Sequence, residues 1–102
     1  MKILAVTACP SGVAHTYMAA EALKNACAAG QIECKVETQG SIGVENAITA
    51  EDLAGATAVV LTNDMPIKDV ERFADLPKIK LPAATVIKSA PAIVAKVKSE
   101  LG

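Results

Sequence analysis

Cys9 and His15 are the residues of this sequence whose types and spacing suggest chemistry. They lie six residues apart, on either side of a Pro-Ser-Gly turn, and His15 is the only histidine in the chain. A cysteine becomes a strong nucleophile as a thiolate, and the N–H groups at a helix N-terminus lower its pKa from about 8.5. A helix is predicted to begin just after Cys9, so we expect a reactive thiolate here. The competing interpretation is a small buried hydrophobic residue.

The segment after Cys9 is suited to binding an anion. Pro10 has no N–H group, so the donors available to a phosphoryl group are those of residues 11–16, and Gly12 permits the turn. The His15 imidazole could donate a hydrogen bond to a phosphoryl oxygen or carry positive charge beside it. The predicted phosphate-binding residues are Pro10, Ser11, Gly12, Val13, Ala14 and Thr16.

The other two cysteines, Cys27 and Cys34, are expected to be structural. Cys27 shares a helical face with apolar residues, and Cys34 shares the inward face of a predicted strand. Three cysteines without paired spacing, together with one histidine, fit neither a disulfide framework nor a zinc site. We therefore expect no metal and no cofactor.

The elements that must position Cys9 alternate between strand and helix. Apolar or alternating runs predict strands at residues 3–8, 32–38, 58–62 and 86–87. Helical spacing and capping signals predict helices at residues 14–29, 49–54, 70–73 and 92–101. The second strand is expected to be an edge strand whose wet face carries Glu33, Lys35 and Glu37. Residues 78–81 are expected to be an irregular or edge piece. This order predicts an α/β fold with an open four-stranded parallel sheet, order 2-1-3-4, in three αβα layers with helices on both faces.

Polar residues follow three of the predicted strands. Cys9 comes after the first strand, Gln39 and Ser41 after the second, and Asp64 after the third. Ligands of open parallel sheets bind at the carboxyl ends of the strands. Gln39, Ser41 and Asp64 are therefore expected to line the site of Cys9.

Length and charge limit the possible functions. The 102 residues suit one domain, 1–102, and the formal net charge of −1, with acids and bases interspersed, argues against nucleic acid as a partner. No run approaches the roughly 20 apolar residues that span a bilayer, and no signal peptide is evident. A cytoplasmic location is expected.

Residues 9–23, with the sequence CPSGVAHTYMAAEAL, resemble the phosphorylation-site signature of the fructose and fructose-like IIB components of the bacterial phosphoenolpyruvate-dependent sugar phosphotransferase system. The similarity continues at residues 35–41, KVETQGS, at Asn46 and Asp64, and at Arg72-Phe73. It covers most of the chain up to about Ala74, and two long motifs together are more specific than one short pattern.

The resemblance implies a phosphotransferase with Cys9 as its phosphocysteine. The phosphodonor would be a phosphohistidine of a IIA protein, and the acceptor a fructose or fructose-like sugar held by the membrane permease IIC. The chain would then be cytoplasmic and associate with the inner face of the membrane through IIC. Residues 74–78 depart from the fructose-type pattern, which favours a fructose-like member.

Three other functions are less compatible with the residues. A low-molecular-weight tyrosine phosphatase or arsenate reductase also has a cysteine loop after its first strand. It needs an arginine six residues after the cysteine to clamp the oxyanion, and that position is His15. A thioredoxin-like role needs a second cysteine at Gly12. A non-catalytic regulatory domain of the same fold would not need Cys9 and His15 together.

Overall fold

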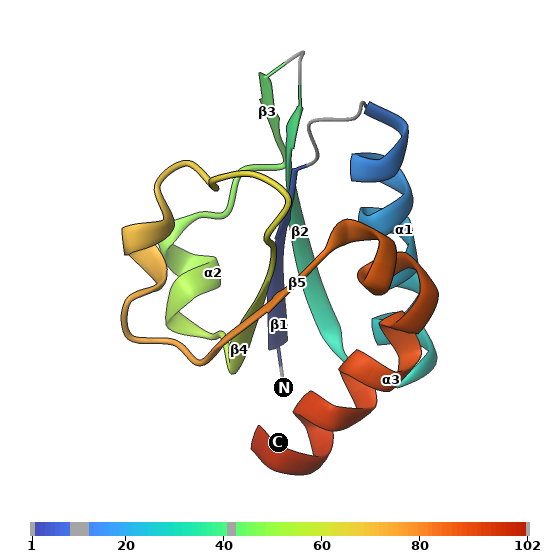
Figure 1. Ribbon diagram of the computed structural model, residues 1–102. Helices are drawn as coiled ribbons and strands as arrows, with labels where there is room; N and C mark the ends of the chain where they lie inside the picture. Colours follow the sequence, from blue (N-terminus) through green and yellow to red (C-terminus); the bar gives the residue numbers. More distant parts are fainter. Residues whose placement is uncertain (1, 9–12, 41–42, 102) are drawn as a thin grey trace.

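A computed structural model describes residues 2–8, 13–40 and 43–101 of the chain (Figure 1). Its centre is a five-stranded sheet with the order β3-β2-β1-β4-β5. The strands are β1 (Lys2–Thr7), β2 (Glu33–Gly40), β3 (Gly43–Glu45), β4 (Ala58–Thr62) and β5 (Lys78–Leu81). β2, β1, β4 and β5 are parallel, and only the short β3 runs antiparallel, to β2. The predicted α/β class and the central place of the first strand are confirmed. The predicted four-stranded, all-parallel sheet with the second strand at its edge is corrected, because the antiparallel β3 pairs with β2 and takes the edge position.

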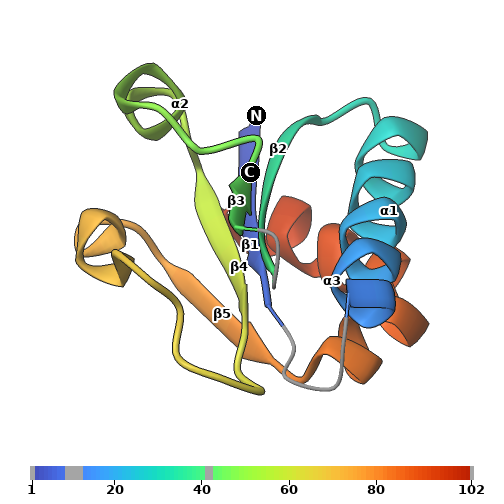
Figure 2. The same cartoon turned by 90° about the horizontal axis from the view of Figure 1, so that it is seen from above.

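Helices cover both faces of the sheet, as Figure 2 shows from above. The long helices α1 (Val13–Ala29) and α3 (Ala83–Leu101) contact each other and lie on one face. The short helix α2 (Ala50–Ala54) and the 3₁₀ turn η1 (Val70–Phe73) lie on the other. The three predicted layers are present, although one outer layer is much thinner.

β1 is buried on both faces because its side chains alternate between two hydrophobic clusters. Ile3 and Ala5 belong to the cluster under α1 and α3, and Leu4 and Val6 to the one under α2 and η1. Side chains of a strand point to opposite faces in turn, so a strand covered on both sides must be apolar throughout. This is why residues 3–8 form a continuous apolar run.

The predicted last strand at residues 86–87 is wrong. Both residues lie in α3, and the last strand is the segment 78–81, where an irregular or edge piece was expected. β5 is an edge strand on which lysines alternate with Ile79 and Leu81. Edge strands commonly carry lysines, and these charges made the segment difficult to identify as a strand from its sequence. Ser89 has non-helical angles, so α3 bends there and Pro91 lies in the first turn of its second half, close to where the helix was expected to begin.

A hairpin replaces the loop that was predicted after the second strand. β2 continues to Gly40 and pairs with β3 through Thr38 with Glu45 and Gln39 with Val44. Figure 1 shows this hairpin projecting beyond the rest of the sheet, beside the start of α1. A hairpin therefore extends beyond the sheet at the carboxyl ends of β1 and β2.

Candidate functional site

The predicted nucleophile, Cys9, follows the carboxyl end of β1 in the sequence. Cys9, Pro10, Ser11, Gly12 and Ser41 lie outside the residues that the structure describes. The two stems of the predicted phosphate-binding segment, Ala8 on one side and α1 from Val13 on the other, are described and define its surroundings.

Three buried threonines lie across the carboxyl ends of adjacent strands. Thr7 of β1 pairs with Thr38 of β2, and Thr62 of β4 lies one residue beyond the last paired position of β1 and β4. By strand alternation all three point to the face that carries α1. Thr62 hydrogen bonds to the main chain of Ala8, and Thr7 donates to the carbonyl oxygen of Thr16 in the first turns of α1. The threonines thus form a polar layer between the apolar core and the site.

The N-terminus of α1 is suited to an anion. The helix begins at Val13 and has no acidic residue in its first turn, so the positive end of its dipole is not neutralised there. His15 is exposed on this turn, whereas Thr16 is only 1% exposed. Among the residues that the structure describes, the Thr16 hydroxyl has no hydrogen-bond partner, which is a costly arrangement for a buried polar atom. A bound phosphoryl oxygen or a thiolate would remove that cost.

Gln39 lies at the carboxyl end of β2 in a buried network. Its side-chain amide donates to Glu37 at 2.7 Å and to the Lys68 carbonyl at 3.2 Å, and its oxygen accepts from the Lys68 N–H at 2.9 Å. Gln39 therefore fastens the segment before η1 to the sheet. Its predicted place in lining the site stays a prediction.

Glu37 was expected on a wet face of its strand, and it is instead buried. Arg72 of η1 donates to its two carboxylate oxygens at 2.9 and 2.6 Å, and the main-chain N–H of Ile48 donates at 2.9 Å. Burial alone would raise the pKa of Glu37, but the hydrogen bonds from Arg72, Gln39 and Ile48 outweigh it and hold the pKa below its usual value. The expectation is corrected because η1 covers this face and supplies the matching cation.

Asp64 follows β4, as predicted, and acts at the start of α3. Its carboxylate accepts a 2.7 Å hydrogen bond from the N–H of Ala83, the first residue of that helix. On the other side, the Tyr17 hydroxyl of α1 donates to Glu45 of β3, and this carboxylate raises the pKa of Tyr17. The elements around the end of β1 are thus tied to one another by side chains.

Comparison with known proteins identifies the family of this arrangement. Residues 4–96 match the family model described as "PTS system, Lactose/Cellobiose specific IIB subunit". The chain is also 57% identical over 100 residues to the "PTS system fructose-like EIIB component 2" of Escherichia coli K12, covering 98% of this chain and 94% of that protein. The chain belongs to the IIB family of the phosphotransferase system. The fructose-like type and the phosphotransferase class that residues 9–23 indicated are thereby confirmed.

Solved IIB structures have the same fold. A domain of the fructose-specific IIABC component of Borrelia burgdorferi superimposes with a TM-score of 0.89 at 42% identity, over 96% of this chain and 93% of that one. A IIB subunit from E. coli K12 gives 0.89 at 38% identity, over 96% and 91%. The tyrosine phosphatase or arsenate reductase alternative is not favoured by these similarities.

Sequence inspection missed the roles of the strand-end threonines and of Arg72. A signal for the threonines was present, because each of three buried strands carries a threonine near its carboxyl end. Within the described parts of the chain, no helix is long and apolar enough to cross a membrane. No group of three or more metal-ligating side chains occurs among those same residues.

Cys27 and Cys34 of this IIB chain lie next to each other between α1 and β2. Cys27 is buried and Cys34 partly buried in the cluster under α1 and α3. The neighbouring Cys27 thiol, and then burial, raise the pKa of Cys34 well above its usual range. At neutral pH Cys34 is therefore a thiol, which is a poor nucleophile.

We expect iodoacetamide at neutral pH to alkylate Cys9 before the other two cysteines, because reaction follows thiolate content and access. A brief native labelling and tryptic mass mapping would measure this. Cleavage after Lys2, Lys24 and Lys35 places Cys9 alone on one peptide and Cys27 with Cys34 on the next. Phosphorylation of the protein should block the first modification. Earlier labelling of the second peptide would contradict a reactive thiolate at Cys9.

Proposed function

We propose that Cys9 accepts a phosphoryl group from a IIA phosphohistidine and passes it to a fructose or fructose-like sugar bound by IIC. The observation that carries this proposal is the exit of β1 toward an α1 N-terminus with no acidic residue in its first turn. The N–H groups at the start of a helix favour both a thiolate and a bound phosphate beside them. Membership of the IIB family supports phosphoryl transfer as the reaction.

The reaction runs in two displacements at phosphorus. In the first, the Cys9 thiolate attacks the phosphoryl group, the S–P bond forms, and the histidine nitrogen of the donor leaves with the electron pair of the P–N bond. In the second, a sugar hydroxyl oxygen attacks the same phosphorus, and the S–P bond breaks to restore the thiolate. The hydroxyl proton leaves to a base outside this chain. A thiolate serves in both steps because it is a good nucleophile and a good leaving group.

Residues of the segment and of α1 would bind the transferred group. The N–H groups of residues 11–16 and the buried Thr16 hydroxyl would donate to its oxygens, and His15 would stabilise its charge from the exposed side of the turn. Ser41, Gln39 and Asp64 would line the remaining sides. The residue six positions after Cys9 is His15 and not an arginine. The phosphoryl group would therefore be bound less tightly than in a phosphatase, which suits onward transfer.

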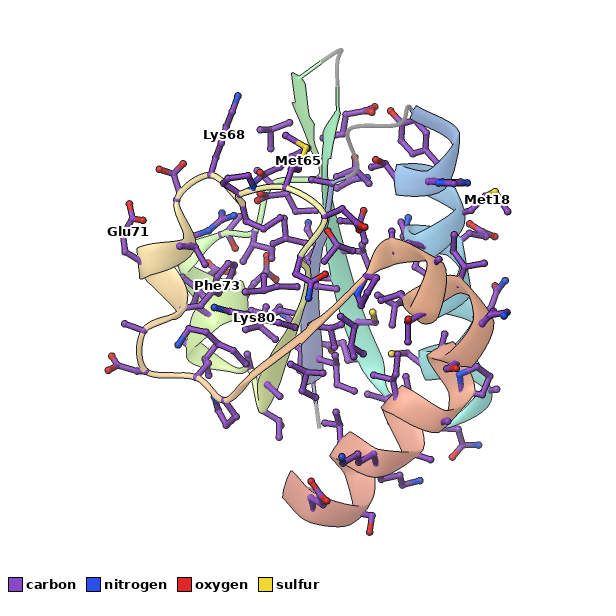
Figure 3. All side chains as sticks on the ribbon, in the orientation of Figure 1. Met18, Met65, Lys68, Glu71, Phe73 and Lys80 are labelled. Atoms are coloured by element: carbon purple, nitrogen blue, oxygen red, sulfur yellow. The ribbon has the colours of Figure 1, made fainter. Side chains whose placement is uncertain are left out.

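Partners would approach the carboxyl end of the sheet. The large apolar side chains exposed in the described structure are Tyr17, Met18, Val44 and Met65. They belong to the beginning of α1, to β3 and to the loop after β4, and Figure 3 shows Met65 at this end of the molecule. Apolar patches with polar surroundings are typical of protein contact sites. We propose that IIA and the membrane permease IIC dock here, and that the chain works as one domain in the cytoplasm at the inner membrane face.

The sugar is proposed from the named relatives. The most extended similarity above is to a fructose-like component, while the family model is described for lactose and cellobiose. A 2-O-alpha-mannosyl-D-glycerate-specific EIIABC component of E. coli K12 is 44% identical over 92 residues, which cover 90% of this chain and 14% of that protein. The longer and closer match favours a fructose-like sugar.

Transfer can be separated from hydrolysis in one assay. The chain would be phosphorylated from phosphoenolpyruvate through the general phosphotransferase proteins and a fructose-type IIA. It would then be mixed with membranes containing a fructose-type IIC and radiolabelled fructose. We expect sugar phosphate to form and p-nitrophenyl phosphate to remain uncleaved. Hydrolysis of the latter, with no transfer to any sugar of a panel that includes cellobiose, would instead favour a phosphatase.

A further inference from the structure

Two buried threonines hold both stems of the segment that contains Cys9. Thr62 binds Ala8, which precedes Cys9, and Thr7 binds the carbonyl of Thr16 in α1, which follows the segment. Thr7 is 1% exposed and Thr62 2%. We name this pair the threonine clamp.

The Thr62 hydroxyl takes the place of a strand partner. It accepts a 2.9 Å hydrogen bond from the Ala8 N–H and donates a 3.0 Å hydrogen bond to the Ala8 carbonyl oxygen. The backbone pairing of β1 with β4 ends at Val6 and Leu61, and Asn63 donates its N–H to Leu81 of β5 instead. The side chain therefore satisfies both main-chain groups of a fully buried residue while the two chains separate.

Thr7 fixes the other stem to the sheet. Its hydroxyl donates a 3.0 Å hydrogen bond to the Thr16 carbonyl across nine residues of chain. Thr16 lies in the first turns of α1, so this bond sets the height of the helix N-terminus relative to the end of β1. With Thr62 bound to Ala8, the start and the end of the segment are held against the same end of the sheet.

We infer that the threonine clamp controls the reactivity of the Cys9 thiol by holding Ala8, to which Cys9 is bonded, and the first turns of α1 in place. This inference rests on the proposed role of Cys9. The influence of a helix N-terminus falls off within its first turn, so a small displacement of a thiolate weakens it. Ala8 is bonded directly to Cys9, and a rotation of its peptide groups would move the sulfur. A misplacement of about 1 Å can lower a reaction rate by about 10²-fold.

The members of the clamp are positioning residues. Their hydroxyls are committed to main-chain groups of the protein, and they act on the phosphoryl group only through the placement of Cys9. Their loss should therefore alter the ionisation of the Cys9 thiol as well as the rate of transfer. A residue with a purely structural role would change stability and leave that ionisation unchanged.

The test is the pH dependence of Cys9 alkylation in Thr62→Val, Thr62→Ser and the wild-type chain. Valine keeps the shape of threonine and removes both hydrogen bonds to Ala8, whereas serine keeps the hydroxyl. Thr57→Val is the matched control, because Thr57 precedes β4 at the opposite end of the sheet. Rates of iodoacetamide modification of the peptide 3–24 would be measured from pH 5 to 10, well below the unfolding temperature.

We expect Thr62→Val to raise the midpoint of the alkylation profile by about one pH unit and to slow reaction at pH 7 by about tenfold. The rate of the full thiolate at high pH should be unchanged, and Thr62→Ser and Thr57→Val should stay within about twofold of wild type. A folded Thr62→Val protein with the wild-type midpoint would overturn the inference. The assay contains no phosphoryl donor, so its result does not depend on whether the proposed transfer to sugar occurs.

If Thr62→Val does not fold, Thr7→Val tests whether the threonine clamp affects the ionisation of Cys9. It removes the bond to the Thr16 carbonyl and leaves Ala8 fully paired, so it disturbs the other stem alone. We expect its midpoint to move in the same direction, with a slowing at pH 7 of about threefold. An unchanged midpoint in Thr7→Val would then reject the clamp as a determinant of Cys9 ionisation.

Discussion

Cys9→Ser is expected to lower phosphoryl transfer to sugar by at least about 10³-fold, because loss of a catalytic nucleophile has effects of this size or larger. A serine hydroxyl is a poor nucleophile without an adjacent base, and its oxygen would also be a poorer leaving group in the second displacement. The change replaces one atom, so we expect the free energy of unfolding to change by less than about 0.5 kcal/mol. Transfer would be followed as radiolabelled sugar phosphate and stability by urea unfolding.

Cys34→Ala is the matched control for this variant. Cys34 is a partly buried thiol between α1 and β2, with a raised pKa that keeps it protonated. Its replacement should leave the rate of transfer within about twofold of wild type, since a protonated thiol is a poor nucleophile. Undiminished sugar phosphorylation by the Cys9→Ser variant would show that Cys9 is not the phosphoryl carrier.

Arg72→Met is expected to destabilise the protein by about 3–5 kcal/mol, because it leaves a buried carboxylate without its cation. Glu37 is 1% exposed, and Arg72 donates to both of its oxygens. Such a loss is a large part of the roughly 5–15 kcal/mol that stabilises a domain. Urea unfolding at pH 7 would measure it, with Glu71→Gln as control. Glu71 is exposed on the same turn and points away from the sheet in Figure 3.

The pH dependence of this loss provides a second check. The pKa of Glu37 is depressed in the folded protein, so the carboxylate contributes stability above its ordinary pKa and loses it as the pH falls through the lower, folded value. The difference between wild type and Arg72→Met should therefore shrink in acid. The double variant Glu37→Gln/Arg72→Met should be less destabilised than Arg72→Met alone. A cost below about 1 kcal/mol at pH 7 would show that the ion pair contributes little.

The framework of the fold could be predicted because its strong elements have clear local signals. Residues 3–8 are apolar throughout and form the central strand, and the alanine-rich segment that follows forms α1. Thr49 and Asp52 form a capping box at the start of α2, within the segment 49–54 for which capping signals predicted a helix. In each case the local preference and the tertiary structure agree.

The errors occurred where tertiary contacts outweighed the local pattern. Val86 and Ile87 are β-branched and suggested a strand. They lie in α3 instead, and the Val86 side chain is fully buried in the core. Glu37 alternated as a solvent-facing residue, but Arg72, far away in the sequence, pairs with it. Sequence spacing cannot show a partner thirty-five residues away.

The candidate site was predicted only in part for the same reason. The strand-to-helix position of Cys9 and the helix start beside His15 follow from local sequence. The bonds from Thr62 to Ala8 and from Asp64 to Ala83 join segments that meet only in the folded sheet. Those contacts give the site its shape, and only the structure reveals them.

The most direct test of Cys9 as the phosphoryl carrier is to locate the phosphoryl group by mass spectrometry after phosphorylation from phosphoenolpyruvate through IIA. Cys9 and His15 share the tryptic peptide 3–24, so the peptide must be fragmented to assign the site. We predict one phosphoryl group on Cys9, and its loss when IIC membranes and sugar are added. A phosphoryl group on His15, or none on Cys9 while sugar is being phosphorylated, would contradict it.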